Sequence, residues 1–348
     1  MDILEESIET CRKDPGTVVF PDCLDQRVLA AAARLKQEGI ARPVLVQSPF
    51  AVRQKILASR QQLACFTVVD HTSGPVLAEN IDAFMALRHE KGKPVTEEAA
   101  QKTMRCALAA SAMMIRKGQV EVGVAGNLSS TAAVLRAGIG LIPKKQKTIS
   151  SFFLMISPKA DKAYILADCA VVPEPGPDVL ADIAVASAEK AKNLLRQEPR
   201  VAMLSFSTKG SASHPRAAMV REAVEKVRKQ APDIRIDGEL QLDAAVVPTV
   251  ASMKAPGSII RGEANVLVFP SLEAGNIGYK MLQRMAGYKA LGPFLQGFDG
   301  GWHDLSRGCS SDDIFNVAVL GLCMQRGAAV TPSARQADLP LNENRRSA

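Results

Sequence analysis

The sequence has few of the residues that build metal centres and disulfide frameworks. Its four histidines are scattered, without an HxH or HExxH spacing, so a histidine-built metal site has little support. Its seven cysteines are odd in number and never spaced as CxxC, which argues against disulfides and structural zinc. These residues are His71, His89, His214 and His303, with Cys11, Cys23, Cys65, Cys106, Cys169, Cys309 and Cys323. We expect reduced thiols, no bound metal, and chemistry that depends on other side chains.

Long apolar runs and nucleotide fingerprints are also missing. No uncharged stretch approaches the length of a membrane span, and the N-terminus, MDILEESIETCRKD, is acidic and amphipathic rather than a secretory signal. We therefore expect a cytoplasmic protein. Neither GxxxxGKS/T nor GxGxxG occurs, so the usual ATP and dinucleotide motifs are absent. The net charge of +7 comes without a nucleic-acid-binding motif, which favours a small polyanionic substrate or, alternatively, a basic surface without functional meaning.

What is present is a repeated α/β pattern. The 348 residues exceed what one hydrophobic core usually organises, so two domains are expected. Short β-rich apolar runs lead through Gly, Ser, Asn or Asp loops into helical stretches, which indicates βα units around largely parallel sheets. A second set of such units begins near residue 149, after the basic run KKQK. The tail, residues 331–348, has no periodicity and is predicted to be disordered.

Three strand-to-helix loops combine glycine with hydroxyl or amide side chains: residues 126–131, 205–211 and 275–278. Backbone N–H groups at the start of a helix bind anions, and glycine lets a ligand approach closely. Taken singly, each loop is explained more simply as an ordinary turn than as a binding site.

The segment 303–313, HDLSRGCSSDD, places hydroxyl, guanidinium, thiol and carboxylate groups directly before an apolar helix. Such density suggests catalysis. The spacing Ser310-x-x-Asp313 also resembles a capping box, in which an acid in the first helical turn has a structural role. Cys309 lacks a histidine base positioned by sequence other than His303, so we do not expect it to be a nucleophile.

Several segments, in order, resemble blocks of the phosphate acetyltransferase (phosphotransacetylase) family over nearly the whole chain. These are VFPDCLDQRVL, AGNLSSTAAVLRAG, LADCAVVPEP, RVAMLSFSTKGSASHP, DGELQLDAAVVP, ANVLVFPSLEAGNIGYK and HDLSRGCSSDDI. AGNLSSTAAVLRAG lacks the His that commonly precedes the Ser-Thr pair, and with SASHP it looks most like the short ethanolamine-utilisation type. The resemblance implies two α/β domains with an active-site cleft between them. Residues 1–148 and 295–330 would form the first domain, and residues 149–294 the second.

The resemblance also implies the reaction and its residues. Acetyl groups would pass reversibly between acetyl-CoA and phosphate, by direct attack of a CoA thiolate in a ternary complex, with no cofactor beyond CoA as substrate. Asp313 matches the base for the CoA thiol, and Ser306 and Arg307 match the adjacent Ser-Arg pair. The candidate substrate-binding residues are Arg136, Arg88, Ser130, Thr131, Ser207, Thr208, Gly210, Asn276 and Gly278. A homodimer is expected, with no nucleic-acid or membrane partner and with enclosure in a bacterial microcompartment as a further option.

Three alternatives stay open at this point. A phosphate butyryl- or propanoyltransferase would differ only in the volume of its acyl pocket. A decarboxylating dehydrogenase of the isopropylmalate type would need a nucleotide site and carboxylates arranged for a divalent metal, and no such acid cluster is evident in the sequence. A non-enzymatic cargo protein of a metabolic compartment would use the helix MDILEESIETCRK for docking.

Overall fold

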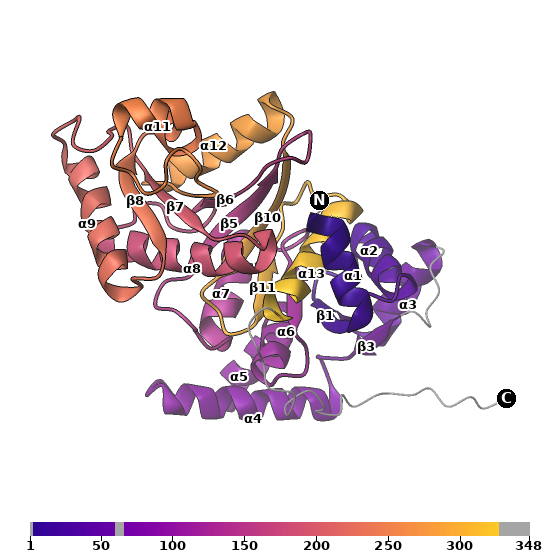
Figure 1. Cartoon of the computed structure of the whole chain (residues 1–348). Helices are drawn as coiled ribbons and strands as arrows, with labels where there is room; N and C mark the ends of the chain where they lie inside the picture. The colour runs from indigo at the N-terminus through magenta and orange to yellow at the C-terminus, as the bar shows by residue number, and fades with distance from the viewer. Residues whose placement is uncertain (1–2, 60–65, 327–348) are drawn as a thin grey trace. The chain divides into compact units, whose positions relative to one another are not determined.

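The computed structural model describes residues 3–59 and 66–326, and Figure 1 shows their helices and strands. The chain divides into two compact units. The first unit contains Ser7–Pro143 and the chain from Asp299 onward, and the second consists mainly of Lys144–Phe298, whereas the sequence placed these boundaries at 148/149 and 294/295. The predicted disordered tail, 331–348, and Cys65 lie outside the described residues. Within the described ranges the six cysteines are free thiols, and no helix is long and apolar enough to cross a bilayer.

A five-stranded parallel sheet in the order β11-β4-β1-β2-β3 forms the centre of the first unit. Its strands are β1 (Gly16–Phe20), β2 (Ala41–Val46), β3 (Thr67–Val69), β4 (Val122–Ala125) and β11 (Gly301–Asp304). Its helices are α1 (Ile3–Lys13, in this unit from Ser7 onward), α2 (Gln26–Gln37), α3 (Pro49–Ser59), α4 (Gly74–Glu90), α5 (Glu97–Met104), α6 (Ala107–Arg116), α7 (Thr131–Leu141) and α13 (Ser311–Arg326). The strand order reverses between β1 and β4, and ligands of open α/β sheets bind at such a point, outside the carboxyl ends of the strands.

Helices on both faces explain why the strands of this sheet are almost entirely apolar. All five residues of β1 are buried. On β11, the indole N–H of Trp302 donates to the carbonyl oxygen of Val134 on α7 at 2.9 Å. The next residue, His303, lies against Gly321 of α13, because successive side chains of a strand point to opposite faces. Helices α7 and α13 therefore cover opposite faces at this edge of the sheet.

The second unit is built on a six-stranded sheet in the order β10-β5-β6-β9-β7-β8. Its strands are β5 (Ser150–Ile156), β6 (Ala163–Ala167), β7 (Arg200–Leu204), β8 (Arg235–Leu240), β9 (Val266–Val268) and β10 (Lys289–Gln296). Its helices are α8 (Pro177–Leu195), α9 (Pro215–Gln230), α10 (Leu242–Val246), α11 (Pro248–Lys254) and α12 (Leu272–Met285). The pairs among β6, β9, β7 and β8 are parallel, whereas β10 and β5 run antiparallel to their neighbours. The predicted class, two α/β units with largely parallel sheets, is confirmed.

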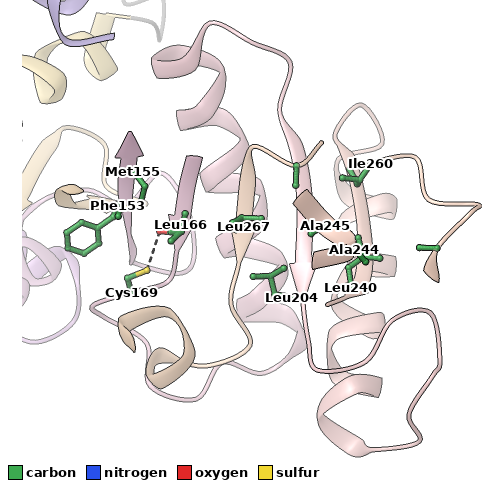
Figure 2. Close-up of a cluster of buried hydrophobic side chains, with 13 residues drawn as sticks. Phe153, Met155, Leu166, Cys169, Leu204, Leu240, Ala244, Ala245, Ile260 and Leu267 are labelled. Atoms are coloured by element: carbon green, nitrogen blue, oxygen red, sulfur yellow. Dashed lines mark hydrogen bonds between the residues drawn. The ribbon is translucent and has the colours of Figure 1, made fainter. Parts of the chain in front are cut away.

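One face of the second sheet packs on a buried cluster that Figure 2 shows. Leu166 and Leu267 come from the neighbouring strands β6 and β9, and Ala244 and Ala245 come from the short helix α10. The thiol of Cys169 lies in the cluster and donates to the carbonyl oxygen of Leu166 at 3.4 Å. Burial of these apolar side chains fixes α10 on the sheet and so positions the loop that follows β8.

Helix α12 approaches the loop after β6 so closely that only glycine fits at the contact. A Cβ on Gly275 would lie 2.1 Å from the carbonyl oxygen of Asp168, far inside van der Waals contact. Beside it, the amide of Asn276 donates to the carbonyl oxygen of Cys169 at 3.0 Å. The start of α12 is therefore fixed to the loop by backbone contact.

We expect Gly275→Ala to destabilise the protein by about 1–3 kcal/mol, because the added methyl forces the backbone of α12 away from Asp168. The matched control is Gly140→Ala in α7, where a Cβ meets nothing within 4 Å and where alanine should stabilise the helix by about 0.5–1 kcal/mol. Urea denaturation of the two variants measures both effects. Equal stability of the two variants would contradict the close contact.

Candidate active site

Polar side chains gather where β1, β4 and β11 end in the first unit. Because the three strands are parallel neighbours, their carboxyl ends lie at one edge of the sheet. Asp22 follows β1, the loop 126–130 follows β4, and Asp304 ends β11 ahead of the loop 305–310. This edge contains the β1/β4 reversal point and is the expected place for a ligand.

Asp22 holds the loop after β4 in place. Its Oδ2 accepts backbone hydrogen bonds from Gly126 (2.9 Å), Leu128 (3.2 Å) and Ser129 (3.0 Å). Its Oδ1 accepts from the hydroxyl of Ser129 at 2.6 Å. The backbone N–H groups of residues 126, 128 and 129, which the sequence suggested for an external anion, thus surround an internal carboxylate. The group that remains for an external anion at the end of this loop is the start of α7.

Ser130 and Thr131 stand at that helix start. Ser130 is the N-cap of α7, and its hydroxyl oxygen accepts from the N–H of Ala133 at 3.3 Å. The hydroxyl of Thr131 donates to Oδ2 of Asp304 at 2.6 Å. Burial raises the pKa of Asp304 to about 6, and the nearby charge of Asp22 adds to the increase, while the hydrogen bonds from Thr131 and Leu305 oppose it.

Arg27, the second residue of α2, holds the loop between β11 and α13. Its guanidinium donates to the carbonyl oxygens of Arg307 (2.8 Å) and Cys309 (2.7 Å). It also contacts the carbonyl oxygen of Asn127 at 3.4 Å and forms an ion pair with Asp25 at 2.6 Å. The hydrogen bond from Arg27 lowers the pKa of Asp25, although burial opposes the change. One guanidinium therefore connects the loops that follow β4 and β11.

Asp313 forms the capping box that its spacing predicts. Its Oδ2 accepts from the N–H of Ser310 at 2.8 Å and from the hydroxyl at 2.9 Å, and the N–H of Asp313 donates back to that hydroxyl at 3.1 Å. Oδ1 of Asp313 receives no hydrogen bond from the described residues. Arg34 of α2 stabilises this helix start through an ion pair with Asp312 (3.1 Å) and a stacking contact on the ring of Phe315 (3.8 Å).

The loop 305–310 exposes two of the predicted catalytic side chains. Ser306 and Arg307 are exposed, while Cys309 between them and α13 is buried. Burial raises the pKa of the Cys309 thiol to about 11, although the charge of Arg27 lowers it. A thiol with this pKa is almost entirely protonated near neutral pH, which makes it a poor nucleophile.

The two arginines predicted to bind anions lie at different places in the first unit. Arg136 is exposed on α7, between one and two turns after Thr131. Arg88 is in the last turn of α4 and donates to the carbonyl oxygen of Lys93 at 3.1 Å. The neighbouring Lys91 bonds to Gly140 at the far end of α7, about 14 Å along that helix from its start. Within this unit, Arg136 therefore lies about 8 Å along the axis of α7 from its start, and Lys91 connects the end of α4 to the end of α7.

The predicted residues of the second unit stabilise its loops. The hydroxyl of Ser207 and the N–H of Gly210 donate to Glu239, at 2.7 Å and 2.8 Å, and Arg221 pairs with the same carboxylate at 2.9 Å. Burial tends to raise the pKa of Glu239, but these hydrogen bonds and the Arg221 charge outweigh it and lower the pKa. The hydroxyl of Thr208 accepts from the N–H of Gln241 at 2.9 Å.

The prediction that residues 275–278 form a strand-to-helix loop is wrong: they lie inside α12 (Leu272–Met285), because Ser271 caps the helix four residues earlier. There Asn276 makes the contact with Cys169 described above. A Cβ on Gly278 would lie 3.2 Å from the ring of Phe269. These contacts show how the predicted side chains of the second unit are held, and their roles toward substrate stay predictions.

Three residues of the first-unit site were missed by the sequence analysis: Asp22, Arg27 and Asp304. A signal existed for the two acids, since each stands at the end of a predicted or short apolar strand, where parallel sheets place ligand-facing groups. Arg27 had no such signal, because its partners lie 280 and 282 residues away. Among the described residues, no group of three or more His, Cys, Asp or Glu side chains is arranged to hold a metal ion.

Comparison with known proteins adds an independent finding. Residues 2–322 match the family described as phosphate acetyl/butaryl transferase. The chain is 41% identical to the phosphate acetyltransferase of Clostridium acetobutylicum, over 94% of this chain and 100% of that protein. It is 40% identical to the phosphate acetyltransferase of Bacillus subtilis, over 87% and 93%. The solved structure of the EutD phosphotransacetylase from Staphylococcus aureus matches with a TM-score of 0.86 at 37% identity, covering 93% of this chain and 98% of that one.

We expect Asp304→Asn to gain stability over the unchanged protein as the pH rises. A raised pKa means that the native state holds the Asp304 proton more tightly than the unfolded state. The contribution of this group to stability is therefore fully present below about pH 4 and lost as the pH passes about 6. Between these two pH values, the unfolding free energy of the unchanged protein should fall by about 3 kcal/mol relative to that of Asp304→Asn. Each unit of pKa difference between the folded and unfolded states corresponds to about 1.4 kcal/mol. Urea denaturation of both proteins across this range measures it, and a difference independent of pH would contradict the buried, raised-pKa carboxyl.

Proposed function

Because this chain belongs to the phosphate acetyl/butaryl transferase family, we propose that it catalyses reversible acetyl transfer between acetyl-CoA and inorganic phosphate. The resemblance read from the sequence blocks is confirmed, and the chain is an acyltransferase. The observation that carries the proposal is the edge of the first sheet. There Arg27 fixes the loop that exposes Ser306 and Arg307, and Arg34 fixes the start of α13, which carries Asp313.

The proposed reaction proceeds in a ternary complex by direct attack of the CoA thiolate on the acyl carbon of acetyl phosphate. The C–S bond forms, the bond between the acyl carbon and the phosphate oxygen breaks, and phosphate leaves with the electron pair. A thiol with an ordinary pKa near 8.5 is only a few per cent ionised at neutral pH, so a base matters. Asp313 accepts the thiol proton, and Oδ1, which receives no hydrogen bond from the described residues, is the oxygen suited to do so.

Ser306 and Arg307 act beside that base. In the proposal the Ser306 hydroxyl orients the thiol, and the Arg307 guanidinium stabilises the negative charge that develops on the acyl oxygen. Both side chains are exposed, and Arg307 makes no ion pair with the described residues, so its charge is available to a ligand. The backbone carbonyl of Arg307 is fixed by Arg27, which limits the conformations from which the side chain can act.

Phosphate recognition is assigned to Arg136 with Ser130 and Thr131, because a guanidinium and a helix start are both anion-binding groups. Arg88, Ser207, Thr208, Gly210, Asn276 and Gly278 stay in the proposal as further substrate-binding candidates. No metal ion or nicotinamide cofactor is required in this scheme, since arginine supplies the positive charge and Asp313 the base.

The proposed assembly is a homodimer. Helix α12 exposes Ile277, Met281 and Met285, spaced by four residues and 58%, 52% and 79% exposed, so they form one apolar stripe. A second copy of the chain is the proposed occupant of this stripe, and a solution mass of one chain would remove the assignment.

The 37% identity to an EutD phosphotransacetylase motivates a cytoplasmic role with access to a bacterial microcompartment. Co-fractionation with such shells would test this part of the proposal.

Thiol release from acetyl-CoA should depend on added phosphate and should persist after exhaustive chelation of divalent ions. A thiol-reactive chromophore measures the release, with propanoyl-CoA and butyryl-CoA as controls for acyl preference. Faster turnover of butyryl-CoA would favour the butyryltransferase alternative. Release that ignores phosphate would overturn the proposed reaction, and loss of activity restored only by a divalent ion would overturn its metal-free chemistry.

Asp313→Asn should lower kcat by about 10² to 10⁴ with KM and folding nearly unchanged, because a general base contributes a factor of this size. Asparagine keeps an oxygen for the Ser310 hydrogen bonds, so a purely capping role predicts at most about 1 kcal/mol of lost stability and normal turnover. Ser310→Ala is the matched control, since it removes the cap and leaves the carboxylate. A folded Asp313→Asn enzyme with turnover within a few-fold of the unchanged protein would refute the base assignment.

A further inference from the structure

The hydroxyl of Thr131, the first residue of α7, is directed by a buried acid. A threonine hydroxyl has one proton and two acceptor lone pairs. The proton of Thr131 points to Oδ2 of Asp304 at 2.6 Å, while the residue itself is exposed. In this arrangement the hydroxyl presents only its lone pairs to an anion at the start of α7, and these repel phosphate oxygens.

Asp304 is held so that it cannot easily release this contact. It is 2% exposed, at the last position of β11. Its other oxygen, Oδ1, makes no hydrogen bond of normal geometry with the described residues, and a Cβ on Gly126 would lie 2.2 Å from it. A proton on Oδ2 would face the Thr131 oxygen directly.

We propose that Asp304 is a positioning residue that controls phosphate binding through Thr131, so that binding of phosphate takes up one proton at Asp304. When Oδ2 is protonated, the acid donates to the Thr131 oxygen, and the hydroxyl proton turns outward to a phosphate oxygen. When phosphate leaves, the proton returns to solvent and Thr131 again donates to the carboxylate. No covalent bond to the protein forms or breaks. This inference rests on the proposed function, because it takes phosphate as the ligand of the α7 start.

The surrounding charges favour this exchange near neutral pH. Burial and the carboxylate of Asp22 both raise the pKa of Asp304, which reaches about 6. A bound anion beside Thr131 raises it further, because like charges disfavour ionisation. Other charged or titratable groups on the elements around this edge include Cys23 after β1, Asp25 at the cap of α2, Arg27 and Arg34 of α2, Arg136 of α7, His303 of β11, Arg307 and Cys309 of the following loop, and Asp312 and Asp313 of α13.

Sulfate is the probe that separates this proton from those of the ligand, because sulfate keeps its charge across the range in which phosphate titrates. We expect the Kd of sulfate, measured by calorimetry on the full chain, to weaken at least about tenfold between about pH 5.5 and about pH 8.5, as linkage to one proton requires. Repeating the titration in buffers of different ionisation enthalpy should show uptake of close to one proton per sulfate at the upper end of this range.

Asp304→Asn tests the mechanism because asparagine resembles the protonated acid. When its NH2 group takes the position of Oδ2, asparagine donates to the Thr131 oxygen as the protonated acid does. This variant should bind sulfate with the tight Kd at every pH and without proton uptake. Thr131→Val should bind weakly at every pH, and Thr131→Ser should restore the pH dependence. Asp82→Asn, at an exposed position on α4, is the matched control and should behave as the unchanged protein.

A sulfate Kd that does not change with pH in the unchanged protein would overturn the inference. A Kd that changes with pH in Asp304→Asn and Thr131→Val as much as in the unchanged protein would also overturn it. Absence of sulfate binding at the lowest pH would also overturn it. If Asp304→Asn does not fold, the two Thr131 variants decide the question. Phosphate-dependent thiol release is measured separately, so failure of the proposed function appears in turnover of the unchanged protein and failure of this inference appears in the sulfate titrations.

Discussion

Buried carboxylates that accept hydrogen bonds from loop backbone are the interaction on which both units depend. Asp22 takes the N–H groups of the loop after β4, and Glu239 takes the N–H of Gly210 and the hydroxyl of Ser207. Asp168, after β6, accepts in the same way from the N–H groups of Ala170 (3.0 Å), Val171 (3.3 Å) and Val172 (2.7 Å). Each carboxylate can be buried because several protein donors replace the water molecules that would otherwise hydrate it. In return, the backbone N–H groups of each loop find hydrogen-bond acceptors although the loop has no regular secondary structure.

This use of backbone donors changes how a substrate anion is recognised. In many α/β proteins the loop N–H groups themselves surround a phosphate. Here several of those groups already surround the chain's own carboxylates, which leaves fewer loop N–H groups for an external anion. Arg27 holds the loop before α13 and Arg34 holds the first turn of α13, whereas Arg136 and Arg307 make no ion pair with the described residues. The arginines thus divide into those that hold the loops and those that are free for a ligand.

Sequence reasoning succeeded where the signal was local. The run EVGVAG followed by SSTAAVLRAG became β4 and α7 with Ser130 as the cap, and Ser310 and Asp313 formed the expected box. It failed where the partners were distant. Thr131 meets Asp304 across 173 residues, and Asp22 meets Gly126 across 104, contacts that only the strand order creates. The loop after β4 was expected to bind an external anion through its N–H groups. The local sequence does not show that the carboxylate of Asp22 accepts hydrogen bonds from those N–H groups instead.

The order in which the chain is made bears on the first sheet. β11, at Gly301–Asp304, pairs with β4, yet the whole second unit is encoded between them. During synthesis the second unit is therefore complete before the first has its last strand, and domains generally fold as units while the chain emerges. Until β11 arrives, β4 is an open edge with unpaired N–H and C=O groups, the kind of edge that recruits other strands. The nascent protein thus passes through a stage in which the edge that will carry the candidate site is open to pairing with other strands.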